Sequence, residues 1–322
     1  MSRFYTSHLC KALALVSLTL AMVAINCNSH YPAVSSDKPA IPREGSLARG
    51  RGLVMTMCAP CHYNEAAHSL IGKPVSGMPR LAGSLHSSNL THSTTHGKLA
   101  MYSDPALMYL IRTGITRDGR FIPYMMRPNM ADEDLNDIVV FLRSADPILQ
   151  GRDTTAGQTR LTVAGRLGQQ ILIRPLPYRT GILRPAASDT LALGQYLVDN
   201  IGCFHCHSRS VMSLNYLHPE LSKGYLTGGA AFLGRDGKVR IPNIRFDPET
   251  GIGEYSKTDL RRVLQQTIGK DGHRLRAPAE VFPVTDEESD AIYAYLKSLP
   301  PIRHKVNRRL PISKAEPATA VR

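Results

Sequence analysis

The sequence of 322 residues contains no tryptophan, and aromatic residues make up only 6% of it. Aromatic side chains supply much of the buried apolar area in most protein cores. Their scarcity therefore excludes a core built mainly around large rings. The length is nevertheless sufficient for two domains, each with a core of its own.

Cysteine is also scarce. The chain has six cysteines, which are Cys10, Cys27 and four that fall in two short motifs. None is left over for a disulfide within the folded part. This usage excludes a small secreted fold stapled by disulfides and ties the cysteines to the motifs instead.

Both motifs have the pattern C-x-x-C-H. The first consists of Cys58, Cys61 and His62, and the second of Cys203, Cys206 and His207. This pattern is the attachment signal of a c-type haem. The two thiols form thioethers to the porphyrin, and the imidazole that follows binds the iron as its proximal ligand. A redox dithiol would lie in a βαβ pattern, and a zinc site would need another cysteine pair nearby. Neither is present, so we predict two covalently bound c-type haems, which would add apolar bulk to both cores.

No apolar run in the sequence is long enough to span a bilayer comfortably. The longest, from Ala12 to Ile25, follows Arg3 and Lys11 and is typical of an export signal. We therefore predict an export signal at residues 1–27. Cys27 stands where the acylated cysteine of a lipoprotein would lie, although the residues before it match that signal poorly. A lipid anchor at Cys27 and an uncleaved N-terminal anchor remain alternatives, and either would associate the chain with a membrane.

Acidic residues are fewer than basic ones. The chain has 26 Asp and Glu residues and 39 Lys and Arg residues, which gives a net charge of +13. We find no nucleic-acid-binding motif and expect no nucleic-acid partner. A basic surface would instead steer acidic redox partners or anionic lipid headgroups toward the chain.

Composition and helical periodicity divide the chain into six parts, and the two longest parts repeat one plan. Asp118-Gly119 corresponds to Asp271-Gly272, and the helix end at residues 141–144 corresponds to that at 295–298. We predict an all-α fold of two helical haem domains in tandem. The parts are an export signal (1–27), a tether (28–44), the first domain (45–150), a connector without sustained helical periodicity (151–186), the second domain (187–300) and a basic tail (301–322).

The motifs, the two terminal helices and the segment from Asn243 to Ser256 together resemble the class I cytochrome c family. More narrowly, they are similar to exported cytochromes that serve as haem subunits of bacterial dehydrogenases. The resemblance covers residues 45–150 and 187–300. It implies electron transfer with a dehydrogenase or another redox protein, in the periplasm or at the outer face of the cytoplasmic membrane. Such subunits commonly carry three haem domains, whereas this chain has two motifs.

The resemblance also implies a methionine as the sixth iron ligand, from the loop before the terminal helix. The first domain offers Met125, Met126 and Met130, and the repeat offset favours Met126, with Met125 second. The same offset places Ala279 opposite Met126 in the second domain, where no methionine follows Met212. The second haem is therefore expected to lack a methionine ligand.

Three alternatives remain for that second iron. His273 could bind it, another side chain such as His218 or Lys270 could reach in, or the sixth position could stay open. An open position would favour a peroxidase-like or gas-reducing enzyme, with Glu280 as a candidate acid or base. We favour electron transfer, which needs no catalytic residue because the cofactor carries the chemistry.

Overall fold

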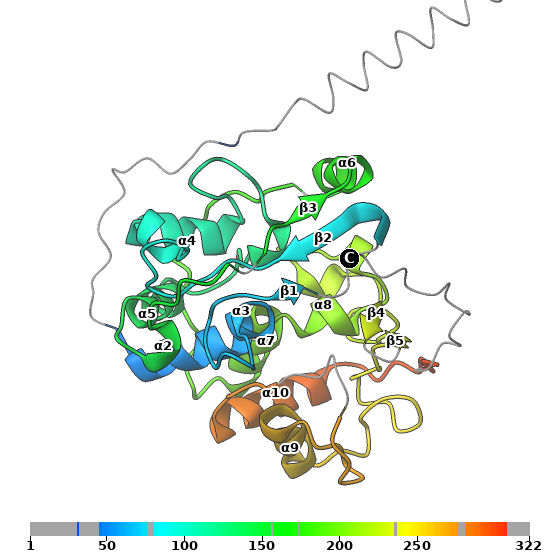
Figure 1. Ribbon diagram of the computed structural model, residues 1–322. Coiled ribbons are helices and arrows are strands. Elements are labelled where there is room, and N and C mark those ends of the chain that lie inside the picture. The colour runs from blue at the N-terminus through cyan, green and yellow to red at the C-terminus, as the bar shows by residue number, and fades with distance from the viewer. Residues whose placement is uncertain are drawn as a thin grey trace, which may run out of the picture.

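The computed structural model describes residue 31 and residues 45–75, 80–155, 157–172, 174–234, 237–275 and 281–307 (Figure 1). The predicted export signal, nearly all of the tether and residues 308–322 lie outside the described residues. No helix within the described ranges is long and apolar enough to cross a membrane.

Helices dominate the described residues, as predicted. The principal ones are α2 (Leu47–Leu53), a π-helical segment (Val54–Cys58), α3 (Ala59–His62), α4 (Asp104–Thr113), α5 (Asp132–Leu142), α6 (Val163–Leu172), α7 (Thr190–Ile201), α8 (Cys203–His207), α9 (Lys257–Gln266) and α10 (Asp286–Ser298). Helix α6 corrects the prediction for the connector. Val163, Leu167 and Ile171 recur every four residues there, which is a helical period that the surrounding glycine and proline residues obscured.

Short strands make the fold less purely α-helical than predicted. Strands β1 (Pro74–Val75), β2 (Gly83–His86) and β3 (Arg160–Leu161) form an antiparallel sheet in the order β1-β2-β3, with Pro74 opposite His86 and Ser84 opposite Arg160. Strands β4 (Ala231–Gly234) and β5 (Gly237–Arg240) form a hairpin. Each strand has at most four residues, so the helices still carry the cores.

Side-chain caps define where the later helices begin. Ser256 caps α9 and Thr285 caps α10, each in a capping box with the acidic residue three positions later. Such boxes satisfy backbone N–H groups that the first helical turn leaves unpaired. The sequence at residues 285–288 therefore defines where α10 begins.

Two hydrophobic cores form, one in each half of the chain. In the N-terminal core α2 packs against α5, and in the C-terminal core α7 packs against α10. Both crossings depend on a glycine. A Cβ atom on Gly50 would lie 2.0 Å from the carbonyl oxygen of Asp137, and one on Gly194 would lie 2.0 Å from that of Ala291. Only glycine permits these two backbones to approach so closely.

The turn that follows α4 is repeated after α9. Isolated β-bridges join Ile115 to Phe121 and Ile268 to Arg274. At the same offset, Ile122 N donates to Gly114 O at 2.7 Å, and Leu275 N donates to Thr267 O at 2.6 Å. Residues 114–122 and 267–275 thus share one backbone arrangement, as the Asp-Gly pairs in the sequence indicated.

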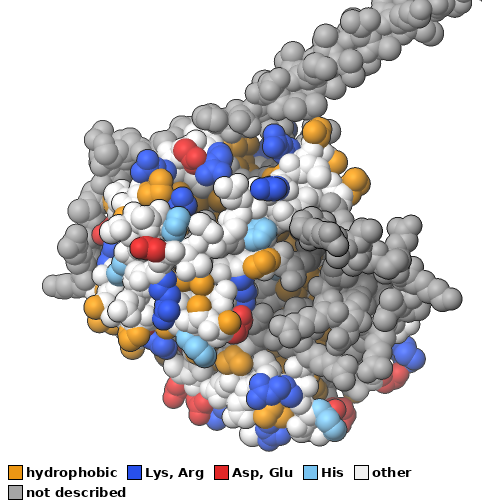
Figure 2. All heavy atoms as spheres, in the orientation of Figure 1, with side chains coloured by type: hydrophobic (Ala, Val, Ile, Leu, Met, Phe, Trp, Pro, Cys, Tyr) orange, Lys and Arg blue, Asp and Glu red, His pale blue; other side chains and the backbone are white. Residues whose placement is uncertain are grey.

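The visible face of the molecule shows how its basic side chains are distributed (Figure 2). On the face of Figure 2 that is drawn in colour, Lys and Arg side chains lie scattered among acidic and apolar ones rather than in one patch. The first residues of the predicted basic tail are fixed to the C-terminal half, because Asn243 donates to Ile302 O at 2.9 Å and the His304 ring donates to Thr227 O at 2.8 Å.

Candidate functional site

The first C-x-x-C-H motif straddles a change of helix type. Cys58 ends the π-helical segment, and Cys61 and His62 lie in the single turn of α3. One helical turn separates the two cysteines, so both thiols lie on one side of the chain. In the second motif, α8 contains Cys203, Cys206 and His207. All four cysteines are outside disulfides and so are chemically available for thioether bonds.

Both histidines of the motifs are oriented by a backbone carbonyl. The His62 ring bonds through Nδ1 to Ser88 O at 2.8 Å, and the His207 ring bonds through Nδ1 to Pro242 O at 2.9 Å. A carbonyl can only accept, so Nδ1 is the donor and carries the proton. Nε2 is then the nitrogen with the lone pair in each neutral ring, as an iron ligand requires. Burial lowers the pKa of His62, which keeps its imidazole neutral. The residues present therefore fit a haem in both places.

The segments that supply these carbonyls are a second repeat, which sequence reasoning missed. The side chain of Asn89 accepts from Thr91 N at 2.8 Å, and that of Asn243 accepts from Arg245 N at 2.9 Å. Eight residues after each asparagine comes a glycine, Gly97 or Gly251. A Cβ atom there would lie 2.3 Å from Thr91 O or 2.0 Å from Arg245 O. The equal spacing of the asparagine and the glycine was the feature of the sequence that could have revealed this repeat.

The three methionines near the end of the first domain have different surroundings. Met130 is fully buried in the N-terminal core. Met125 is partly exposed and ends a short 3-10 turn. Met126 is 1% exposed and lines a cavity between the two halves. Met126 thus differs from Met130 in lining a cavity, and its role as an iron ligand stays a prediction.

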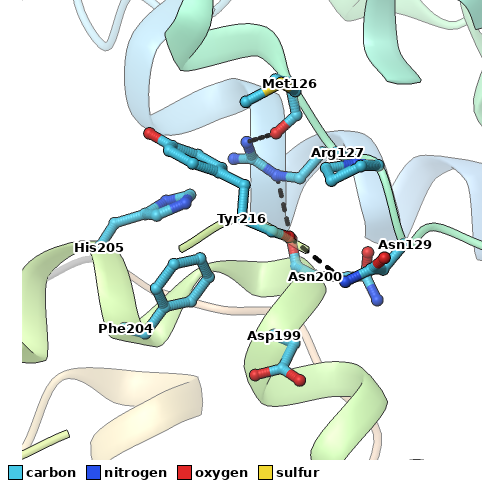
Figure 3. Close-up of a pocket in the computed structure, with 9 residues that line it drawn as sticks. Met126, Arg127, Asn129, Asp199, Asn200, Phe204, His205 and Tyr216 are labelled. Atoms are coloured by element: carbon cyan, nitrogen blue, oxygen red, sulfur yellow. Dashed lines mark hydrogen bonds between the residues drawn. The ribbon is translucent and has the colours of Figure 1, made fainter. Parts of the chain in front are cut away.

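The cavity beside Met126 has a volume of about 10 Å³ and is lined from both halves (Figure 3). Arg127 and Asn129 come from the N-terminal half, and Phe204 and His205 are the middle residues of the second motif. Burial raises the pKa of Cys58 to about 11, and the nearby Arg127 guanidinium opposes that rise. Arg127 therefore lies beside the first motif and also at the cavity that the second motif lines.

In the C-terminal half, the side chains that we considered as a sixth ligand lie in solvent. The His273 ring is 86% exposed and its Nδ1 is 3.4 Å from Asp271 Oδ2. The His218 ring is 64% exposed, and the Lys270 ammonium donates to Glu254 O at 2.7 Å.

The position opposite Met126 has no ligand atom in the described residues. Ala279 and Glu280 lie outside them. Phe282 N donates to Leu264 O at 2.8 Å, as Arg127 N donates to Ile111 O at 2.7 Å. This register places Val281, rather than Ala279, opposite Met126. Neither alanine nor valine can coordinate iron, so the expected lack of a methionine is unaffected.

Asp199, which also lines the cavity, should make the free energy of unfolding depend on pH. Burial raises its pKa to about 7, and the Tyr225 hydroxyl, which donates to it at 2.9 Å, opposes the rise. Tyr295, Glu220 and Cys203 also lie near this carboxyl or its hydrogen-bond partner. A raised pKa favours the protonated, folded form at low pH. The free energy of unfolding should therefore fall as pH rises from about 4 through about 7, by at most about 4 kcal/mol.

The Asp199→Asn variant checks this expectation, because it keeps the shape and removes the titration. Denaturant unfolding of the haem-loaded protein at about pH 5 and about pH 8 should show a smaller loss of stability in the variant than in the wild type. Equal losses in the two proteins would contradict a buried, protonated Asp199.

Comparison with known proteins relates the chain to a recognised family. Residues 47–146 match the Cytochrome c family. The chain is 28% identical over 281 residues to the fructose dehydrogenase cytochrome subunit of Gluconobacter japonicus, covering 81% of this chain and 54% of that protein. It is 27% identical over 261 residues to the cytochrome c subunit of the quinone alcohol dehydrogenase of Gluconacetobacter polyoxogenes, covering 76% and 54%. It is 26% identical over 313 residues to the gluconate 2-dehydrogenase cytochrome c subunit of Pantoea cypripedii, covering 89% and 64%.

The chain thus spans about half to two thirds of the length of these curated relatives. A solved structure, the reducing HAO-like protein complex of Kuenenia stuttgartiensis, aligns at 14% identity over 81% of this chain and 99% of that one, with a TM-score of 0.23. That score does not show a shared fold.

Proposed function

We propose that this chain, a relative of the cytochrome c subunits of bacterial dehydrogenases, is a dihaem c-type cytochrome. In this proposal it passes electrons between redox partners outside the cytoplasmic membrane. A dehydrogenase subunit is one such partner. Export through residues 1–27 and a location in the periplasm or at the outer face of the cytoplasmic membrane belong to the same proposal, and a lipid anchor at Cys27 is an alternative within it.

The repeated histidine geometry is the observation that carries the proposal. His62 and His207 each follow a cysteine pair, and each donates from Nδ1 to the carbonyl of the residue just before an asparagine. Two motifs without a shared role would have no reason to give both rings the same hydrogen bond. The two cores and the two glycine-mediated helix crossings support division into haem domains at 45–150 and 187–300.

The haem supplies a one-electron change at iron when it is bound, and the chain positions and tunes it. Cys58 and Cys61 would hold the first group and Cys203 and Cys206 the second. His62 and His207 would each offer Nε2. The sulfur of Met126 would close the first iron to small molecules and raise its potential. No side chain has to move a proton.

Replacing Met126 tests this assignment. In haem-loaded Met126→Ala we expect loss of the methionine-to-iron charge-transfer band, binding of cyanide by the first haem, and a fall in its midpoint potential on the order of 100 mV, within the roughly 0.8 V range that axial ligands span. Met125→Leu is the matched control and should behave like the wild type. If Met125→Leu lost the band and Met126→Ala kept it, Met125 rather than Met126 would be the iron ligand.

The second haem decides between the proposed function and its alternative. Because Val281 stands opposite Met126, a peroxidase-like or gas-reducing enzyme with an open second iron is the second candidate. Low-temperature EPR of the oxidised protein with and without cyanide separates the two. Two low-spin signals unchanged by cyanide support electron transfer, and His273→Ala then tests that ligand. A high-spin signal that cyanide converts to low-spin supports the enzyme.

A further inference from the structure

The loop that carries Met126 is held by the opposite half of the molecule as well as by its own half. Arg127 Nε donates to Asn200 O in α7 at 3.1 Å (Figure 3). Asn129 Nδ2 donates to Leu217 O at 2.9 Å and to Tyr216 O at 3.3 Å. Together these bonds connect the residues on the C-terminal side of Met126 to two separate segments of the C-terminal half.

The end of this loop is also buried in the opposite half. Ala131 is fully buried and belongs to the C-terminal core, although it directly precedes α5 of the N-terminal half. Its backbone N–H donates to the Tyr196 hydroxyl of α7 at 2.9 Å. The loop of residues 123–131, which we name the Met126 loop, therefore lies in the interface between the halves.

The N-terminal half makes fewer hydrogen bonds to the Met126 loop, and it also buries Met130 in its own core. Arg127 N donates to Ile111 O at 2.7 Å, and Arg112 donates to Met130 O at 2.6 Å. Apart from the short turn Pro123–Met125, the loop has no regular secondary structure to fix it. An axial sulfur must remain at a fixed place to bind iron, so the contacts that fix this loop decide how well Met126 can act as a ligand.

We propose that the C-terminal half positions Met126 on the first haem iron, with Arg127 and Asn129 as the positioning residues. This inference rests on the proposed function. It means that ligation of the first haem depends on docking of the second domain. Loosening the interface would weaken the iron–sulfur bond although no residue of the first haem's own attachment motif changes.

The test uses the full-length, haem-loaded Arg127→Gln/Asn129→Ala double variant. Because Arg127 also donates to Met126 O at 2.9 Å and to Tyr124 O at 3.3 Å within the loop, Asn129→Ala alone is the variant that leaves these bonds in place and reports on the opposite half. In the double variant we expect the methionine-to-iron band to be lost at a pH about 1 unit lower than in the wild type, which corresponds to about tenfold weaker ligation. We also expect cyanide to bind the first haem at least about tenfold faster. Backbone amides of residues 124–131 should exchange hydrogen faster, which is a readout independent of the haem.

Arg120→Gln is the matched control. Arg120 lies in the turn before the Met126 loop, is 69% exposed, and pairs with Asp118 of its own half. This variant should keep wild-type ligation. Asn129→Ala alone, which alters a partly exposed side chain, provides a mild variant and should show the same changes to a smaller extent.

Three outcomes are distinguishable. Weaker ligation in the double variant and in Asn129→Ala, but not in Arg120→Gln, supports the inference. If the double variant keeps the methionine-to-iron band, the pH midpoint and a cyanide-binding rate within about twofold of the wild type, the inference is overturned and the proposed function is intact. Absence of a methionine band from the wild type itself, with no effect of Met126→Ala, overturns both the ligand assignment and this inference.

Discussion

Gly50→Ala is expected to lower the free energy of unfolding by about 3 kcal/mol. The added Cβ atom would lie 2.0 Å from Asp137 O and 2.9 Å from Phe141 Cβ, so α2 and α5 would have to separate. Both obstacles belong to a buried helix rather than to the end of a flexible side chain. The loss would outweigh the roughly 0.5–1 kcal/mol by which alanine favours a helix over glycine.

The same helix provides the matched control. A Cβ atom on Gly52, two residues further along α2, would meet Pro283 O at an ordinary 3.8 Å. Gly52→Ala should therefore be neutral or stabilise the protein by up to about 1 kcal/mol. Denaturant unfolding of both variants makes the comparison. Equal stability of Gly50→Ala and Gly52→Ala would show that the α2–α5 contact is not as close as described.

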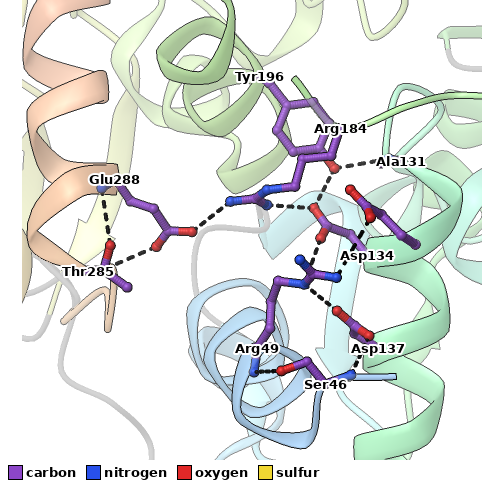
Figure 4. A network of polar contacts seen from close by, with 10 residues as sticks. Ser46, Arg49, Ala131, Asp134, Asp137, Arg184, Tyr196, Thr285 and Glu288 are labelled. Atoms are coloured by element: carbon purple, nitrogen blue, oxygen red, sulfur yellow. Dashed lines mark hydrogen bonds and ion pairs between the residues drawn. The ribbon is translucent and has the colours of Figure 1, made fainter. Parts of the chain in front are cut away.

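Arg184→Met is expected to lower stability by about 3 kcal/mol and to loosen the two halves from each other. The guanidinium donates to Asp134 at 2.8 Å in α5 and to Glu288 at 2.8 Å in α10, so one connector residue joins both terminal helices (Figure 4). Asp134 is fully buried and also accepts from the Tyr196 hydroxyl at 2.6 Å. Without Arg184 its carboxylate retains only the more distant Arg49, at 3.5 Å, as a cationic partner among the described residues.

Arg261→Met is the control, because it removes an arginine that pairs with two carboxylates but does not join the two halves. Arg261 also pairs with two carboxylates, Asp286 and Asp290, but both belong to α10, and its side chain is 31% exposed. Its replacement should lower stability by no more than about 1 kcal/mol. Small-angle X-ray scattering should show a larger radius of gyration for Arg184→Met only. Unchanged dimensions and stability in Arg184→Met would contradict a bridge between the halves.

The features that the sequence predicted well are local and repeated. The two cysteines of each motif are three residues apart with the histidine adjacent, so each predicted attachment motif spans about one helical turn, within α8 in the second motif and across the boundary between the π-helical segment and α3 in the first. The Asp-Gly pairs at 118–119 and 271–272 predicted the matching turns because glycine adopts the left-handed backbone that both turns need (φ of 75° at Gly119 and 79° at Gly272). Met126 stays a prediction, because the repeat offset that favoured it shifts by two residues at this point, where Val281 rather than Ala279 stands opposite Met126.

The contacts between the halves could not be predicted. Arg127 and Asn200 are 73 residues apart, and their bond joins a side chain to a backbone carbonyl, which leaves no mark in the sequence around Asn200. The connector was expected to lie between the domains, but nothing in its composition distinguishes Arg184 from Arg174 or Arg179. Such contacts occur once in the chain, so no repeat reveals them.

The correspondence of residues 89–97 to residues 243–251 was missed for a different reason. Only Asn89 and Gly97 match Asn243 and Gly251 there, while most side chains between them differ. The shared feature is a backbone path, in which the asparagine caps the turn and the glycine packs against a carbonyl. Two positions in nine are a weak signal until the structure shows the turn that they serve.

The number of haems attached to each chain tests the central claim most directly. The protein would be matured with haem-attachment machinery, denatured to release any unbound haem, and weighed intact by mass spectrometry. We predict the mass of the chain plus two haems, and one haem in either Cys58→Ser/Cys61→Ser or Cys203→Ser/Cys206→Ser. One haem or none on the wild-type chain would contradict a dihaem cytochrome.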